Sequence, residues 1–313
     1  MGAYILRRLA STVLVMGIVA VFVFLLLHLS PGDPAAIIAG DNATNEQIAG
    51  IRRQLGLDDA LPVQFFRWLA AVLQGDLGIS IFSNEPVLKL ISQRVEPTLS
   101  LALTTLCVAV TIAVTLGVLA AWKVGTWVDR LLMVISVIGF SVPVFVVGYM
   151  LIYMFSITLR WLPVQGYSPI DQGLGPWIER LILPSIALGL AYVALIARIT
   201  RTAMLDVLAE DYIRTAKAKG VATRSMLLKH ALKNAGVPII TVIGIGVALL
   251  IGGVVITETV FNIPGVGRLV VDAISKRDYP IIQGVILVFS GIYVLVNLAV
   301  DLSYTLLDPR IRY

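Results

Sequence analysis

The sequence contains six apolar runs without a charged residue, each of a length that can cross a bilayer. An α-helix rises about 1.5 Å per residue, so about 20 apolar residues span a hydrocarbon core of about 30 Å. The fourth run is the shortest, but it lacks charge, and a single Arg or Lys at a helix centre would cost about 2.5–3.5 kcal/mol. We therefore expect six membrane-spanning helices, at 9–27, 98–122, 131–159, 181–197, 235–257 and 281–300.

The overall composition supports a membrane protein. Hydrophobic residues make up 58% of the chain and charged residues 14%, whereas soluble domains average about 45–50% and about 25%. Cys107 is the lone cysteine, and with His28 and His230 it offers neither an internal disulfide nor a metal cluster. We expect an all-α polytopic fold with no metal and no cofactor held by this chain.

The first apolar run lies where a signal peptide would lie, with Arg7 and Arg8 before it. It is longer than the usual apolar region of about 7–15 residues, and the following "HLSPGDPAA" lacks a clean small-residue cleavage site. An uncleaved helix is the favoured interpretation.

Basic residues in the short connections predict the orientation, because cytoplasmic loops are enriched in Lys and Arg. The opposite connections contain fewer basic residues, mixed with Asp171, Glu179, Asp272 and Asp278. Both termini are therefore expected in the cytoplasm. The basic residues on that side are Arg7, Arg8, Lys123, Arg130, Arg198, Arg201, Arg214, Lys217, Lys219, Arg224, Lys229, Lys233, Arg310 and Arg312.

The long connection from Leu29 to Pro97 is expected outside, with helices of its own. Thr44 and Gln47 have the spacing of a capping box, and Gly56 is placed to end that helix. A second helix is expected to start near Pro62. These two helices either lie on the membrane surface or pack against the spanning helices, or they contact a soluble extracytoplasmic partner.

A basic insert, "DYIRTAKAKGVATRSMLLKHALKNAGVP", stands between the fourth and fifth runs. Helical spacing of its apolar residues predicts a helix before Gly220 and a second one after it. A nucleic-acid-binding helix-turn-helix is disfavoured because both helices are expected to use their apolar faces for packing within a membrane-tethered protein. Two interpretations remain: a basic loop that merely anchors topology, either solvated or lying against anionic lipid, or a docking element for a cytoplasmic protein.

At this insert the sequence resembles the cytoplasmic "EAA" loop of ABC importer permeases, in the form of the oligopeptide and dipeptide branch. "LSPGDPA", "QLGLDDALPVQFFRWL", "GDLGIS", "ETVFNIPGVGRLVVDAISKRDYPIIQG" and "DPRIRY" agree with that branch across the whole chain. Ala216 and Gly220 match the loop, but Arg214 and Thr215 replace its Glu and first Ala, and Lys233 replaces its later Pro. The resemblance thus supports docking but not a contact made by a Glu.

The resemblance implies a type I ABC importer permease in the bacterial cytoplasmic (inner) membrane. Residues 1–95 would form an N-terminal helix with an extracytoplasmic segment, and residues 96–313 a five-helix core with a coupling loop at about 198–235. The implied partners are a second similar permease, two cytoplasmic ABC ATPases, an extracytoplasmic binding protein and membrane lipid, and no nucleic acid. The implied ATPase-docking residues are Arg214, Ala216, Lys217, Gly220, Val221, Ala222, Thr223, Arg224 and Met226.

The chain is not expected to be an enzyme. It has no Walker A motif, and Gly is never followed directly by Lys, so ATP and Mg²⁺ would be bound by partner subunits. No grouping of Ser, His, Asp or Cys suggests catalysis.

Several residues within or beside the spans are candidates for helix packing or for the transport pathway. Pro143 should kink the third span, and small residues recur every four positions in the fifth. Glu258 and Asp301 lie at span ends, where an interfacial position or a salt bridge is favoured over ion coupling. The small residues are Gly244, Ala248 and Gly252.

Two other classes of function stay open. An ion-coupled secondary transporter would use Glu258 or Asp301, but the halves show no inverted repeat. A membrane scaffold or receptor would need a signalling domain, which the sequence does not show. For an importer we expect a short peptide or peptide-like substrate. Dipeptide, oligopeptide, glutathione and nickel-chelate importers share this pattern, so neither the substrate nor the residues that bind it are predicted.

Overall fold

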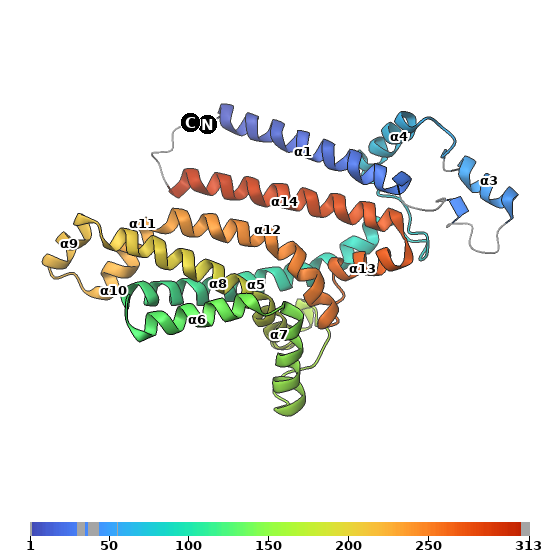
Figure 1. Ribbon diagram of the computed structural model, residues 1–313. Coiled ribbons are helices and arrows are strands. Elements are labelled where there is room, and N and C mark those ends of the chain that lie inside the picture. The colour runs from blue at the N-terminus through green and yellow to red at the C-terminus, as the bar shows by residue number, and fades with distance from the viewer. Residues whose placement is uncertain (1, 30–34, 37–43, 55, 308–313) are drawn as a thin grey trace. The chain divides into compact units, whose positions relative to one another are not determined.

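The computed structural model describes residues 2–29, 35–36, 44–54 and 56–307 (Figure 1). In these ranges the chain is helical apart from turns and connections, and an isolated bridge pairs Ile79 with Pro86. The longer helices are α1 (Gly2–Leu29), α5 (Val87–Trp122), α8 (Leu174–Leu208), α12 (Gly236–Val260) and α14 (Tyr279–Leu307). The shorter elements are α3 (Asn45–Gln54), α4 (Leu61–Leu73), α6 (Trp127–Ser141), α7 (Val144–Leu151), η1 (Ile152–Thr158), η2 (Ile170–Gln172), α9 (Asp211–Ala218), α10 (Thr223–Ser225), η3 (Met226–Ala231), α11 (Leu232–Asn234) and α13 (Val266–Lys276).

The long apolar helices confirm the predicted polytopic, all-helical fold. Among the described residues, four helices are long and apolar enough to cross a membrane unaided. The number rises to six when each of two bent helix pairs is counted as one span. The six apolar runs of the sequence therefore all have helical counterparts.

The third predicted span is broken rather than kinked. The helices at 127–141 and 144–158 meet at 102°, and α7 turns away from α6 in Figure 1. Pro143 precedes the first residue of α7, and Val142 before it is extended, with φ −89° and ψ 127°. Proline disfavours a helical conformation in the residue that precedes it. The kink expected at Pro143 in the span 131–159 is therefore a full break of the helix.

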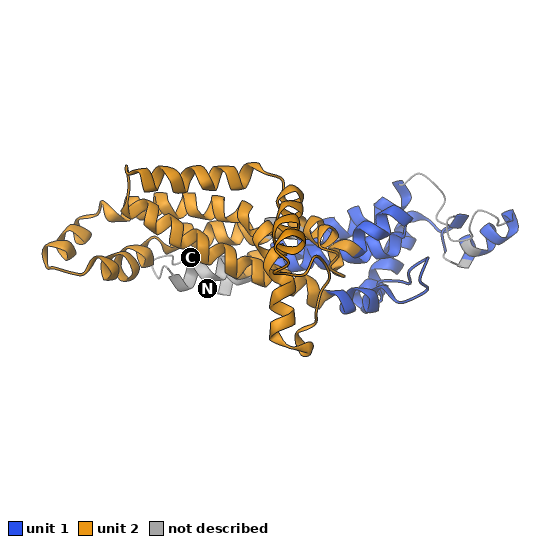
Figure 2. Ribbon diagram, turned by 90° about the horizontal axis from the view of Figure 1, so that it is seen from below, with its two compact units in different colours: residues 1–94, 269–294 blue, residues 95–268, 295–313 orange. Residues whose placement is uncertain are grey.

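The chain divides into two compact units, coloured separately in Figure 2. Unit 1 comprises residues 1–94 and 269–294, and unit 2 comprises residues 95–268 and 295–313. The two-part organisation proposed from the sequence, 1–95 and 96–313, stays a prediction.

Unit 1 contains the two helices predicted for the segment after the first span. Thr44 N–H donates to Gln47 Oε1 at 2.8 Å, and Gln47 N–H donates to Thr44 Oγ1 at 3.3 Å, so the capping box is confirmed. Gly56 has φ +63°, and Leu57 N–H returns to the Arg52 carbonyl at 3.0 Å. The glycine thus ends α3 as its sequence position indicates.

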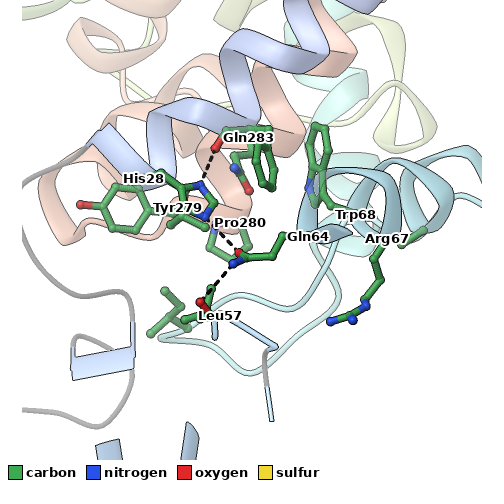
Figure 3. Close-up of a pocket in the computed structure, with 12 residues that line it drawn as sticks. His28, Leu57, Gln64, Arg67, Trp68, Tyr279, Pro280 and Gln283 are labelled. Carbon is green, nitrogen blue, oxygen red and sulfur yellow. Dashed lines mark hydrogen bonds between the residues drawn. The ribbon is translucent and has the colours of Figure 1, made fainter. Parts of the chain in front are cut away.

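A pocket of about 310 Å³ lies in unit 1 among α1, α4 and the start of α14 (Figure 3). His28 Nε2 lies 3.0 Å from Gln64 Oε1, and Gln64 Nε2 donates to the carbonyls of Leu57 and Asp59. Phe24 packs its ring against Trp68 beside these polar groups. The hydrogen bonds therefore fix α4 to the end of α1 and to the loop before α4.

In unit 2, α8 is the central helix, and it packs against α6, α7 and α12. Gly253 on α12 faces α8 closely, because an added Cβ would lie 2.6 Å from Leu188 Cδ1 and 3.3 Å from the Tyr192 hydroxyl. Gly252 is exposed, and a Cβ there would meet nothing within 4 Å. Close approach to α8 within this chain therefore involves Gly253, whereas Gly252 faces away from it.

Candidate functional site: the basic segment at 198–235

The basic segment begins as a continuation of a long apolar helix. The predicted span ended at Ala197, but α8 continues to Leu208 and carries Arg198 and Arg201 on its last turns. The helix α9 follows, and α10, η3 and α11 then lead into α12 (Figure 1). The predicted order of helix, glycine turn and helix is confirmed, and the extended Glu210 separates α9 from the long helix α8.

Gly220 forms the turn between α9 and α10. Its φ is +76°, in the left-handed region that a residue with a Cβ rarely adopts. Val221 N–H donates to the Ala216 carbonyl at 3.2 Å, and Gly220 N–H donates to the Lys217 carbonyl at 3.0 Å. These two bonds form a Schellman motif. An added Cβ would meet nothing within 4 Å, so a substitution at Gly220 acts through the backbone conformation and not through a clash.

An apolar core holds the segment in place. Ile213 on α9, with Leu227 and Ala231 on η3, is buried in one cluster with Met204 of α8 and Val118 of α5. Burying a large aliphatic side chain contributes about 1.5–3 kcal/mol. The segment is therefore a packed part of the fold.

A polar contact joins the two helices on either side of the turn. Asn234 Nδ2 donates to the Tyr212 hydroxyl at 2.8 Å, and also to the His230 carbonyl at 3.0 Å. Because Tyr212 lies on α9 and Asn234 on α11, this contact fixes the spacing of the two arms.

The sequence-predicted docking residues lie together around the turn. Arg214 is exposed and pairs with Asp211 at 3.4 Å, a solvent-facing contact that contributes little stability. Three of the remaining residues are half-buried: Ala216, Val221 and Met226. The others are exposed: Lys217, Gly220, Ala222, Thr223 and Arg224. The structure thus brings the predicted residues onto one rigid, largely exposed turn.

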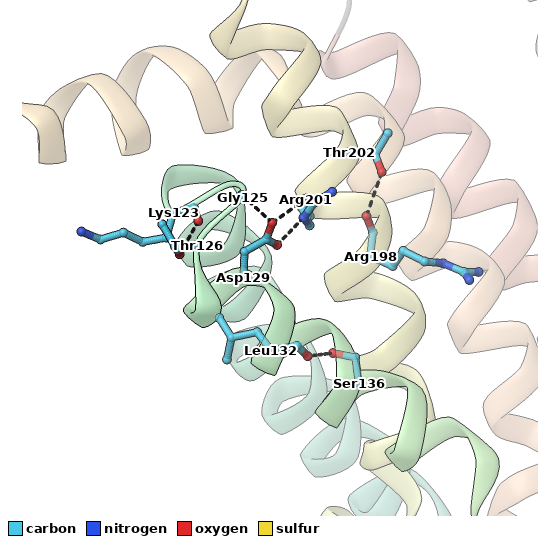
Figure 4. A network of polar contacts seen from close by, with 9 residues as sticks. All are labelled: Lys123, Gly125, Thr126, Asp129, Leu132, Ser136, Arg198, Arg201 and Thr202. Carbon is cyan, nitrogen blue, oxygen red and sulfur yellow. Dashed lines mark hydrogen bonds and ion pairs between the residues drawn. The ribbon is translucent and has the colours of Figure 1, made fainter.

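A buried ion pair joins the start of this segment to α6 (Figure 4). Arg201 donates from Nε to Asp129 Oδ1 at 2.6 Å and from Nη2 to Oδ2 at 2.8 Å. Gly125 N–H donates to the same carboxylate at 3.0 Å. The side chain of Asp129 is 6% exposed and that of Arg201 is 24% exposed. The pair ties the start of α6 and the turn after α5 to α8.

Sequence reasoning missed this pair, because Arg201 was counted only among the basic residues of the segment. The available signal was Asp129 itself, a single acidic residue in an otherwise basic connection between two apolar runs.

Glu258 is fully buried within the protein, and the expected interfacial position or salt bridge stays a prediction. Its Oε1 accepts from Thr98 Oγ1 at 2.6 Å, and its Oε2 accepts from Arg268 N–H at 2.9 Å. Val266 N–H donates to Thr98 Oγ1 at 2.8 Å. Gly265 packs directly against the carboxylate. A carboxylate at the first turn of α13 is stabilised by the helix dipole and by free backbone donors, so Glu258 caps that helix.

The other packing or pathway candidates are not brought together into one site by these contacts. Pro143 lies at the α6–α7 break, and Gly244 is buried on α12. The side chains of Ala248 and Asp301 lie outside the described residues.

A second polar cluster, also missed from the sequence, lies where α5 meets the connection before α8. The Tyr167 hydroxyl donates to Glu96 Oε1 at 2.9 Å and lies 3.0 Å from Ser100 Oγ. Trp177 Nε1 donates to the same Ser100 oxygen at 3.2 Å. Burial raises the pKa of Tyr167, and the hydrogen bond to Glu96 adds to that rise. The phenol therefore remains a neutral donor at physiological pH.

Sequence comparisons match the whole length of the chain to known membrane transport components. Residues 113–313 match the family described as binding-protein-dependent transport system inner membrane component. Residues 1–102 match the N-terminal family of the same transport systems.

Individual relatives cover nearly all of the chain. A probable peptide ABC transporter permease protein of Sinorhizobium fredii is 63% identical over 313 residues, which is 100% of both chains. The glutathione transport system permease protein GsiC of Salmonella paratyphi A is 46% identical over 310 residues, 99% of each chain. The corresponding protein of Escherichia coli K12 is 45% identical over 310 residues, again 99% of each chain.

Among solved structures, a crystal form of the MetNI methionine ABC transporter in an inward-facing conformation resembles the chain with a TM-score of 0.58. The sequences are 18% identical, and the match covers 70% of this chain and 96% of the other. At this identity the likeness concerns the fold alone, and it agrees with the predicted type I importer architecture.

The Asp129–Arg201 pair leads to a stability prediction. Asp129→Asn should lower the free energy of unfolding by about 2–3 kcal/mol, less than the about 3–5 kcal/mol for a fully buried pair, because Arg201 is partly exposed. The midpoint of thermal unfolding in detergent measures the change. Asp211→Asn, which removes an exposed pair, is the matched control and should change it by less than about 0.5 kcal/mol. Equal effects of the two substitutions would contradict a structural role for the buried pair.

Proposed function

The chain belongs to the family of binding-protein-dependent transport system inner membrane components, and from this premise we propose that it is the permease subunit of an ATP-driven importer. The single observation that carries the proposal is the turn at Gly220, which is held rigidly between α8 and α12 and exposes a basic edge. A short, ordered turn of this kind suits docking into a cleft of a cytoplasmic ATPase.

The chemical work is divided among subunits in this proposal. Two partner ATPases bind ATP and Mg²⁺, a second similar permease completes the pathway, and an extracytoplasmic binding protein delivers the substrate. Closure of the ATPases moves the spans only through contacts that differ between the two conformations. The Gly220 turn, with its two Schellman bonds and its apolar base, transmits that movement to α8 and α12.

The substrate class is a short peptide or peptide-like molecule. The relatives include a probable peptide permease and glutathione permeases, which supports this class. The protein is placed in the bacterial inner membrane, with the Gly220 turn and both termini in the cytoplasm. Charge distribution in the short connections supports this orientation.

The ion-coupled alternative receives no support from Glu258. Its carboxylate is buried in hydrogen bonds to Thr98 and to the backbone of α13. A coupling ion would have to displace donors that the fold provides, which favours a structural role for this residue.

Uptake by the complete assembly tests the proposal. Vesicles that contain this chain with its co-purified partners should accumulate peptide only when ATP and loaded binding protein are both present. With ATP held constant, collapse of the proton gradient should leave the rate unchanged. Uptake driven by a proton or sodium gradient without ATP would overturn the importer proposal.

Gly220→Val tests the turn itself. Valine at a positive φ introduces strain of about 1–3 kcal/mol, enough to misplace the turn while six apolar helices remain inserted. We expect normal abundance but loss of ATP hydrolysis stimulated by loaded binding protein, measured together with uptake in one reconstituted sample. Gly236→Val, at the first residue of α12 where an added Cβ meets nothing within 4 Å, is the matched control. Normal stimulation in an inserted Gly220→Val protein would return the segment to the interpretation of a solvated loop.

The orientation has an independent test. In a Cys107→Ala background, Ala222→Cys should react with a membrane-impermeant thiol reagent only from the cytoplasmic side, because Ala222 is exposed on the turn. Ser83→Cys, exposed in the segment after the first span, should react only from outside. The opposite pattern of labelling would reverse the topology.

A further inference from the structure

A groove of about 460 Å³ runs between the last turns of α5 and the helix η3, within unit 2. Its floor includes the buried side chains of Val118 and Leu227. Its walls include Leu119, Trp122 and Leu228, which are 39%, 46% and 47% exposed. An apolar groove of this kind on a basic segment is unexpected for a surface in water.

Positive charge lies at one end of the groove. Arg224 lines it, and Lys123 Nζ lies 4.2 Å from the centre of the Trp122 ring that forms one wall. Neither cation has an ion-pair partner among the described residues. The sequence contains no Asp or Glu from 97 to 128 or from 212 to 257, the two stretches that form the walls. The chemistry therefore fits a ligand with a long aliphatic part and an anionic end.

The position of the groove along α5 identifies such a ligand. The apolar run of α5 ends at Trp122, and tryptophan is enriched where hydrocarbon meets headgroups. Cytoplasmic leaflets are rich in anionic lipids, which attract basic residues near the surface. We propose that the groove binds an anionic phospholipid of the cytoplasmic leaflet, with an acyl chain along Val118 and Leu228 and its phosphate beside Arg224 and Lys123.

The bound chain has a structural consequence for η3. It covers the apolar side of that helix that faces α5 and leaves Gly220 uncovered, whereas Thr223 and Arg224 line the groove and also belong to the predicted docking residues. This inference rests on the proposed cytoplasmic orientation, but it does not require that an ATPase docks on the turn.

Fluorescence quenching of Trp122 by brominated lipid tests the site. The complete assembly is placed in nanodiscs of phosphatidylglycerol and phosphatidylcholine, with dibrominated acyl chains on one lipid at a time. The signal of Trp122 is taken as the difference from the same assembly carrying Trp122→Phe. Trp127, 73% exposed at the start of α6, is the matched reference, read against Trp127→Phe.

At Trp122 we expect a relative binding constant for phosphatidylglycerol over phosphatidylcholine of about tenfold, the preference that one to two interfacial cations provide. At Trp127 the constant should be near one. A value near one at both positions would overturn the proposal. Quenching of Trp122 by neither lipid would also overturn it, because the groove would then be covered by protein.

Substitutions separate the two parts of the ligand. Arg224→Gln should remove most of the preference for phosphatidylglycerol, whereas Lys229→Gln, an exposed cation on η3 that does not line the groove, should retain it. Equal loss in both variants would indicate general charge attraction and contradict a site.

Thr115→Phe fills the groove from α5, outside the docking residues, and should weaken quenching by both brominated lipids, whereas Thr115→Ala should not. Unchanged quenching in Thr115→Phe would contradict acyl-chain binding, whether or not the ATPase interaction is intact.

Discussion

The long helix α8 carries the chain from the apolar core into the basic segment, and the remaining features of unit 2 depend on it. A helix satisfies most of its own backbone groups where no water is present, and α8 runs from Leu174 to Leu208 with Pro184, which has no N–H to donate, inside it. The last turns of α8 belong to the basic segment, and the helix ends at Leu208, before the extended Glu210 that precedes α9. A displacement of the turn therefore reaches α8 through the buried cluster that contains Ile213, Leu227 and Met204.

Those contacts are of two kinds, with different responses to movement. The apolar contacts of α8, such as that of Gly253 with Leu188 and Tyr192, are short-range and depend on the shapes of the packed side chains. The bidentate pair between Arg201 and Asp129 holds the first turn of α6 at a fixed place on α8. Because packed interfaces are bistable rather than continuously deformable, α6 and α8 would move together when the turn is pulled.

Features that depend on neighbouring residues in the chain could be predicted from the sequence. Uncharged runs, the Thr44–Gln47 capping box and the positive φ of Gly220 all follow from chemistry within a few residues. The end of α8 was placed too early, because absence of charge marks the apolar core and not the helix, which continues with an amphipathic surface. The break at Pro143 was foreseen as a kink, but its angle of 102° depends on what α7 packs against.

Contacts between distant segments could not be predicted in the same way. Nothing near Glu258 in the sequence indicates that Thr98 would meet its carboxylate, 160 residues away. The four-residue spacing of Gly244, Ala248 and Gly252 identified a face of α12, but the choice between Gly252 and Gly253 depends on where α8 lies. The two interpretations first offered for the basic segment, docking and a basic loop that anchors topology in water or against anionic lipid, also need not compete. The apolar groove occupies the side of η3 toward α5, and the exposed turn lies at Gly220, so one segment has surface for both.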